Sequence, residues 1–201
     1  MAKPRPVPGL DATRKLRPNA RRILAVRIEE VHSYDGAIAD PARVGELHDM
    51  RIAFKRLRYL LEIFAVAFDA DLKPYLSTVK DLQDILGEIH DRDVQVPMLL
   101  DHLEWLDERE AMAVRRNVAE AMAAGEVAPR RRRPTERAYR EFRERLEVGM
   151  RADERIGVHA LIARRRRERD DLHRRFLDEW RRLKHERFRR SLEAALGISR
   201  D

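Results

Sequence analysis

ELHDMRIAFKRLRYLLEIF, residues 46–64, is the stretch that decides the fold we expect for this chain. At about 100° per residue, its apolar side chains fall on one broad face of a helix: Met50, Ala53, Phe54, Leu57, Leu60, Leu61 and Phe64. A separate line on the same helix carries a histidine and three cations, namely His48, Arg51, Lys55 and Arg58. One helix therefore offers a core face and a row of positive charge, and such a row suits a linear polyanion.

The next predicted helix, at about 72–96, repeats this division into two faces. Its apolar face carries Leu82, Ile85, Leu86 and Ile89, and another face carries Lys80, Gln83, Gly87 and His90. A glycine inside a helix costs about 1 kcal/mol relative to alanine. Gly87 therefore indicates a close approach, which we expect to be another helix and which a ligand would also explain.

The composition indicates an all-α protein and points to an anionic partner. Its 201 residues suit one domain, or one domain with a large insertion, and 39% of them are charged, which favours long amphipathic helices. A formal net charge of +7 points to nucleic acid, an acidic membrane surface or a polyphosphate-like polymer. Because the sequence has no cysteine, it excludes disulfides, cysteine-based zinc sites and thiol nucleophiles. With no apolar run of 18 residues and no apolar leader, we expect a cytoplasmic protein.

Helix start and stop signals divide the chain into a tail and a helical bundle. Asn19 and Asp40-Pro41 are the expected starts of the first two helices, and Pro97 is expected to break or kink the third. We expect a disordered basic, Pro-rich tail at 1–18 and helices at about 20–33, 41–68, 72–96, 98–124, 135–152 and 158–196. Within a domain spanning 19–201, residues 98–152 are an expected insertion with an Arg-rich linker at 125–135.

The last predicted helix carries most of the surplus positive charge. Between Leu161 and Leu196 there are thirteen Lys and Arg residues against seven Asp and Glu residues. Arg175, Arg182 and Arg189 recur every seven residues and fall on one line. A solvated face with ion pairs explains most of these charges, and a second wall for an anion groove explains the aligned arginines.

These motifs resemble the CHAD family, the conserved histidine α-helical domain. The resemblance rests on His48, Arg51 and the cluster Lys55-Arg56-Leu57-Arg58, followed by Leu86-Gly87 and by Asp91, Asp93 and Val94. It implies a helical bundle that binds inorganic polyphosphate in a basic groove, often on polyphosphate granules. Because the sequence has no Gly-rich phosphate loop of the Walker type, we expect binding without catalysis, metal or cofactor. Members typically carry two pseudo-symmetric four-helix repeats, whereas this chain has one copy of each motif. We therefore expect two chains to associate as a homodimer.

The resemblance and the charge rows together give the expected polyphosphate-binding residues: His48, Arg51, Lys55, Arg56, Arg58, Lys80, Arg92, Arg175, Arg182 and Arg189. Lys and Arg in rows match repeated oxyanions, and Arg can bind them through two hydrogen bonds at once. Asp91 and Asp93 are expected to hold arginine side chains in place. Lys80 and Arg92 would face the groove only if the third helix packs beside the second.

Two other functions stay open from the sequence. His48-Asp49 and His90-Asp91 look like the dipeptides of HD-type metal-dependent phosphohydrolases, although neighbouring residues on a helix diverge by about 100° and surrounding cations repel a metal ion. Non-specific nucleic-acid binding would use the same cation rows. Aromatic residues make up only 6% of the chain, and no stacking platform stands out.

Overall fold

The computed structural model describes residues 3–13, 15–124 and 152–199. Its helices are α1 (Leu16–His32), α2 (Val44–Phe64), η1 (Ala65–Ala67), α3 (Lys73–Ala123), α5 (Ala152–His185) and α6 (Phe188–Ala195). In the part of the chain that is described, no strand occurs. The predicted all-α class and the helical bundle are confirmed.

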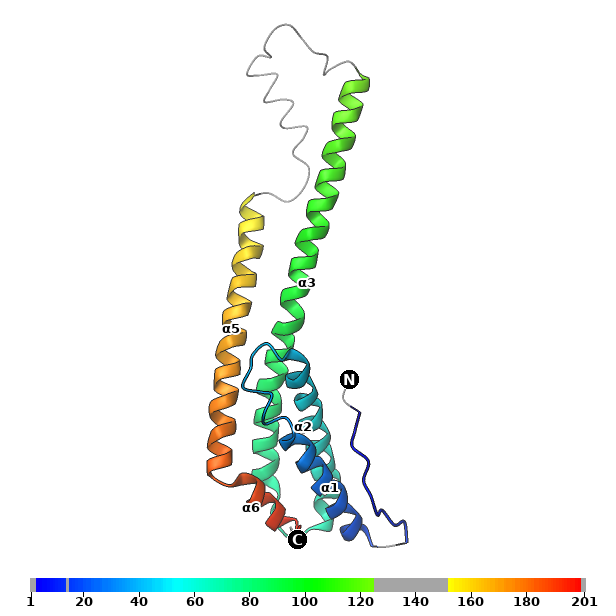
Figure 1. Ribbon diagram of the computed structural model, residues 1–201, viewed down its shortest axis with the longest axis vertical. Coiled ribbons are helices and arrows are strands. Elements are labelled where there is room, and N and C mark those ends of the chain that lie inside the picture. The colour runs from blue at the N-terminus through cyan, green and yellow to red at the C-terminus, as the bar shows by residue number, and fades with distance from the viewer. Residues whose placement is uncertain (1–2, 14, 125–151, 200–201) are drawn as a thin grey trace. The chain divides into compact units, whose positions relative to one another are not determined.

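Two compact units make up the chain, the first from residues 1–94 and 166–201 and the second from residues 95–165. In the first unit α1, α2, the start of α3 and the end of α5 lie side by side, and α6 lies at the end where the chain terminates (Figure 1). In the second unit Leu103 of α3 and Ile162 of α5 are both buried, and Arg155 of α5 binds Asp107 and Glu110 of α3.

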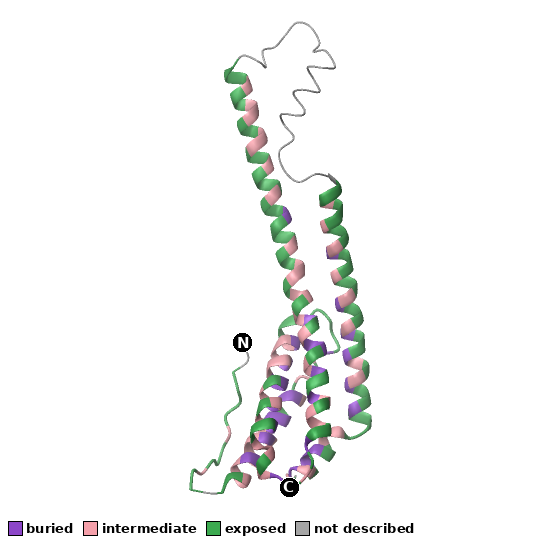
Figure 2. Ribbon diagram, turned by 180° about the vertical axis from the view of Figure 1, so that it is seen from behind, coloured by how far each residue is buried: buried purple, intermediate pink, exposed green. Residues whose placement is uncertain are grey.

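The hydrophobic core of the first unit uses the apolar faces predicted for α2 and α3. Figure 2 shows the buried residues on the inner sides of these helices. From α2 the core takes Met50, Ala53, Phe54, Leu57 and Leu61, and from α3 it takes Leu82, Ile85, Leu86 and Ile89. Phe176 and Trp180 of α5 complete it, with the Trp180 ring edge-on to Phe54. Burial of apolar area is the main favourable term here.

A buried ion-pair network joins α1 to α2. Arg27 and Glu30 are neighbours on α1 and are 6% and 3% exposed, and Arg56 Nη1 of α2 donates to Glu30 Oε1 at 2.7 Å. Arg27 also donates to the backbone oxygen of Arg5 at 2.7 Å, so the segment before α1 contacts the bundle. Removing one member of such a network would leave an uncompensated buried charge.

The expected starts of the first two helices are wrong. α1 begins at Leu16, and Asn19 does not cap it, because its side chain bonds the backbone of Asp11. α2 begins at Val44, since Asp40 Oδ1 accepts from the Ala42 amide in a turn at 2.9 Å. The carbonyl of Pro41 accepts a hydrogen bond from Arg169 at 2.6 Å, which holds Pro41 outside the helix.

Two expected helix boundaries further along are also wrong. α3 continues through Pro97, where a proline removes a single intrahelical hydrogen bond without ending the helix. The long helix expected at 158–196 is instead α5 and α6, separated at Arg187, whose φ of 57° lies in the left-handed region. The predicted linker at 125–135 and helix at 135–152 lie outside the described residues, apart from Ala152, where α5 begins.

Candidate polyanion-binding site

The two rows of polar residues on α2 and α3 face each other. We call His48, Arg51, Lys55 and Arg58 the α2 row, and Lys80, Gln83, Gly87 and His90 the α3 row. The Nδ1 atoms of His48 and His90 lie 3.2 Å apart, and their ring centroids are 4.5 Å apart. One helical turn further along α2, Arg51 Nε lies 3.7 Å from the position that a Cβ on Gly87 would occupy.

Matching spacings extend this pairing along both helices. The residues of each row are separated by three, four and three positions, and α2 and α3 run in opposite directions. The same register therefore places Lys55 opposite Gln83 and Arg58 opposite Lys80. At 1.5 Å per residue the α2 row is about 15 Å long, enough for several phosphate groups of an extended polymer.

The neighbour of Gly87 is a side chain and not the backbone of another helix. If a Cβ is built on Gly87, Arg51 Nε is the one atom of another described residue that lies within 4 Å of it, leaving aside the chain neighbours and the backbone of α3 itself. The sequence favoured close packing of two helices as the reason for this glycine. The distance of 3.7 Å is ordinary van der Waals contact, so a methyl group would fit beside Arg51.

Several polar groups of the rows have no partner among the described residues. Arg51 Nε and Gln83 Oε1 are both buried without a hydrogen bond. Within the part of the chain described, Lys55 and Lys80 are exposed and lie in no ion pair with a carboxylate. Because buried polar groups are rarely left unsatisfied, the unbonded Arg51 and Gln83 atoms mark a place where a ligand or water is expected.

At the end of the α2 row that holds Lys55 and Arg58, the cations contact an aromatic ring and a carboxylate. The Tyr59 ring lies beneath two cations, with Lys55 Nζ at 5.8 Å and Arg58 Cζ at 4.7 Å from its centroid. Arg58 Nε also lies 3.4 Å from Glu62, whose side chain is half exposed. Glu62 therefore already opposes part of the charge of Arg58, whose side chain is only 19% exposed.

The surroundings of His48 disfavour the charged form of its ring. Burial lowers its pKa below the usual value, and the neighbouring His90 lowers that pKa further. When both rings are neutral, one Nδ1 can donate to the other, whereas two protonated rings would place two donors against each other. His48 therefore contributes a hydrogen-bonding ring and not a positive charge while it contacts His90.

Two of the expected site residues on α2 and α3 lie apart from the facing rows. Arg56 is bound to Glu30 of α1, as described above. Arg92 lies 3.5 Å from both Glu88 and Glu168, so two carboxylates already oppose its charge. Nearby, Asp93 Oδ1 accepts from Arg169 Nε at 2.9 Å, which is the positioning role expected for this aspartate.

The three aligned arginines of the last predicted helix do not form one wall. Arg182 binds Glu179 and Glu186, and these hydrogen bonds raise its pKa above the usual value. Arg189 lies on the separate helix α6 and binds Glu193 and Glu29 of α1. Arg175 is exposed on α5. Because the chain turns at Arg187, the spacing of seven residues does not carry the line from Arg182 to Arg189.

The comparisons with known proteins cover the part of the sequence that contains the facing rows. The family model described as the CHAD domain matches residues 2–100, which include both rows. The chain belongs to the CHAD domain family. No match was found among curated proteins or among solved structures. The CHAD assignment predicted from His48, Arg51 and the following motifs is thereby confirmed.

Two further findings concern membranes and metals. None of the described helices is long and apolar enough to span a membrane. Among the described residues, no three His, Cys, Asp or Glu side chains gather in a way that could hold a metal ion. His48 and His90 do come together, as a metal-dependent phosphohydrolase would require, but in direct contact with each other.

Proposed function

We propose that this CHAD domain binds inorganic polyphosphate between the α2 and α3 rows, as a binding module without catalytic activity. The observation that carries the proposal is the antiparallel register of the rows, which brings Arg51, Lys55, Arg58 and Lys80 into one strip. A polymer of oxyanions offers a repeated acceptor to each of these cations. No described carboxylate pairs with Arg51, so its guanidinium group is available to such a ligand.

His48 and His90 close one end of the strip, in contact with each other. While one ring donates to the other through Nδ1, the Nε2 atoms remain for contacts outside the pair. A phosphate beside His48 would favour the protonated form of its ring, because an opposite charge nearby raises the pKa of a histidine. Polyphosphate binding is therefore expected to strengthen as the pH falls from 7 to 6.

The proposal is tested by competition between polymers at matched phosphate concentration and salt. Long-chain polyphosphate is expected to displace labelled polyphosphate, while single-stranded and duplex DNA displace it poorly. The double variant Arg51→Gln/Lys80→Gln should bind polyphosphate at least tenfold more weakly, because each lost charge-assisted contact contributes more than 1 kcal/mol. The control variant Arg116→Gln/Arg174→Gln removes the same charge from exposed positions outside the rows. Preferred binding of DNA, or equal loss in both variants, would contradict the proposal.

We also propose that two chains associate, which would give the paired arrangement of two repeats that the CHAD resemblance implies. We further propose that the protein acts in the cytoplasm on polyphosphate granules. Light scattering should report twice the chain mass of 23.7 kDa, with or without polyphosphate. A mass of one chain under both conditions would refute the dimer and leave the binding proposal standing. A fluorescent fusion should colocalise with granules, and a diffuse signal would refute that part.

A further inference from the structure

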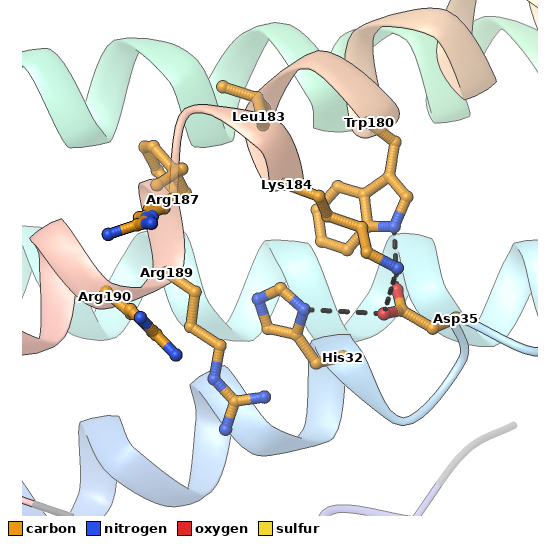
Figure 3. A pocket seen from close by; sticks show the side chains of 9 residues that line it. His32, Asp35, Trp180, Leu183, Lys184, Arg187, Arg189 and Arg190 are labelled. Atoms are coloured by element: carbon orange, nitrogen blue, oxygen red, sulfur yellow. Dashed lines mark hydrogen bonds and ion pairs between the residues drawn. The ribbon is translucent and has the colours of Figure 1, made fainter.

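A cavity of about 430 Å³ lies in the first unit, away from the facing rows. It is formed by the end of α1, the end of α5 and the start of α6 (Figure 3). Its volume is within the range of pockets that take small organic ligands. Neither the α2 row nor the α3 row contributes a residue to it. The cavity therefore requires an explanation separate from polyphosphate binding.

One part of the lining is apolar and aromatic. Trp180, Leu183 and Phe188 supply this part. Trp180 is 4% exposed and is fixed in place, because its Nε1 donates to Asp35 Oδ1 at 2.7 Å. The His32 ring lies 4.9 Å from the Trp180 ring, between centroids. Trp180 and Leu183 are each 4% exposed, so a ligand meets this part mainly at the half-buried Phe188, which favours a flat or apolar body.

The other part of the lining is cationic, and two of its arginines are not neutralised. Lys184 is paired with Asp35 at 2.9 Å, and Arg189 is held by Glu29 and Glu193. In contrast, neither Arg187 nor Arg190 forms an ion pair with any carboxylate in the described ranges. Figure 3 shows both side chains on the same side of the cavity, where they could hold an anionic group.

The backbone at Arg187 adds to this arrangement. Its φ of 57° is unusual for a residue other than glycine, asparagine or aspartate. This turn brings Arg187 and the first residues of α6 to the wall of the cavity. Strained residues of this kind cluster at ligand sites.

His32 gives the site a neutral hydrogen-bonding group between its two parts. Burial lowers the pKa of His32 to about 4, and the adjacent Arg189 lowers it further, so the ring is uncharged at pH 7. Nδ1 lies 4.0 Å from Asp35 Oδ2, and the other ring nitrogen points toward the arginine side (Figure 3). A neutral imidazole can accept or donate there without repelling a cation or an anion.

We propose that this cavity binds a small phosphorylated ring compound of the nucleoside triphosphate type, with its phosphates on Arg187 and Arg190 and its ring against Phe188, close to Trp180. The ligand chemistry follows from the two-part lining, since a phosphate chain satisfies the two arginines and a planar ring covers the apolar wall. The site is independent of the polyphosphate strip, so each can be lost without the other.

The chain offers its own reporter for this test. Trp105 and Trp180 are its two tryptophans, and Trp105 lies exposed on α3 in the second unit. In a Trp105→Phe background, the fluorescence of Trp180 reports on the cavity alone. Three probes are titrated in EDTA at fixed ionic strength: ATP, inorganic triphosphate and adenosine. We expect a saturable fluorescence change with ATP, binding of triphosphate at least tenfold weaker, and no binding of adenosine at the same concentrations.

Variants of the two free arginines separate this site from the polyphosphate strip. Arg187→Gly removes the guanidinium and also suits the left-handed backbone, so this variant should fold at least as stably as the parent. Together with Arg190→Gln it should weaken ATP binding at least tenfold, whereas the control Arg174→Gln should not change it. Arg51→Gln/Lys80→Gln should leave ATP binding unchanged. Triphosphate binding as tight as ATP, loss of ATP binding in the strip variant, or unchanged ATP binding in the Arg187/Arg190 variant would each overturn the proposal.

Discussion

The salt dependence of polyphosphate binding gives a quantitative test of the facing rows. Each cation that neutralises a phosphate of a single-stranded polyanion contributes about −0.7 to the slope of log K against log salt. The four cations of the strip, Arg51, Lys55, Arg58 and Lys80, therefore predict a contribution of about −2.8. Between 50 and 200 mM salt this contribution alone weakens binding by about 50-fold.

The triple variant Arg51→Gln/Lys55→Gln/Arg58→Gln leaves only Lys80 of these four cations. The slope should therefore become less steep by about 2, while helix content by circular dichroism stays unchanged, because none of the three side chains belongs to the hydrophobic core. Binding is measured by fluorescence anisotropy of end-labelled polyphosphate at five or more salt concentrations.

A matched control separates the strip from the overall charge of the protein. Arg116→Gln/Arg174→Gln/Arg181→Gln lowers the formal charge by the same amount, at exposed arginines that pair with carboxylates on their own helices. This control should keep a slope close to that of the parent. An equal change of slope in both triple variants would refute the reasoning, because net charge and not the facing rows would then govern binding.

Three further predictions concern stability. Because the folded pKa of His32 is about 4 and its ordinary value is 6.5, the unfolded chain binds more protons between these values, and stability should fall by about 2 kcal/mol from pH 7 to pH 5. In urea titrations at both pH values, His32→Gln should remove most of that loss, and an undiminished loss would contradict the assignment. Gly87→Ala should stabilise the protein by up to about 1 kcal/mol, since a methyl group fits beside Arg51, and a lower urea midpoint would show that the space is needed. Glu30→Gln should destabilise it by about 3 kcal/mol by leaving Arg27 without its carboxylate, and a change below 1 kcal/mol would argue against the buried network.

Much of the candidate site could be predicted because helical periodicity fixes which side chains share a face. The α2 row and the α3 row were both predicted from spacing alone. Their pairing could not be predicted from either row, because it depends on the direction and register in which α2 and α3 pack. The contact between His48 and His90 settles that register. Both rows share a spacing of three, four and three residues, and this was the feature of the sequence from which their pairing could have been predicted.

The errors came from residues whose role depends on tertiary contacts. Arg56 belongs to the cationic motif of α2, yet Glu30 of α1 holds it, and no local pattern reveals that partner. The turn at Arg187 has no glycine or proline to mark it. The signal in the sequence was a change in the apolar pattern: Phe176, Trp180 and Leu183 share one helix face, and Phe188 and Leu192 continue on a shifted face. A stripe that shifts in this way indicates that the helix bends or ends. The same turn removed Arg189 from the expected line and created the cavity beside His32.

The most direct measurement is a crystal structure of the protein with a short-chain polyphosphate. The facing-row account predicts a chain of phosphates along α2 and α3, with oxygens at hydrogen-bond distance, about 3 Å, from Arg51, Arg58 and Lys80. Phosphates gathered along α5 at Arg175, or bound elsewhere with the two rows left bare, would contradict it.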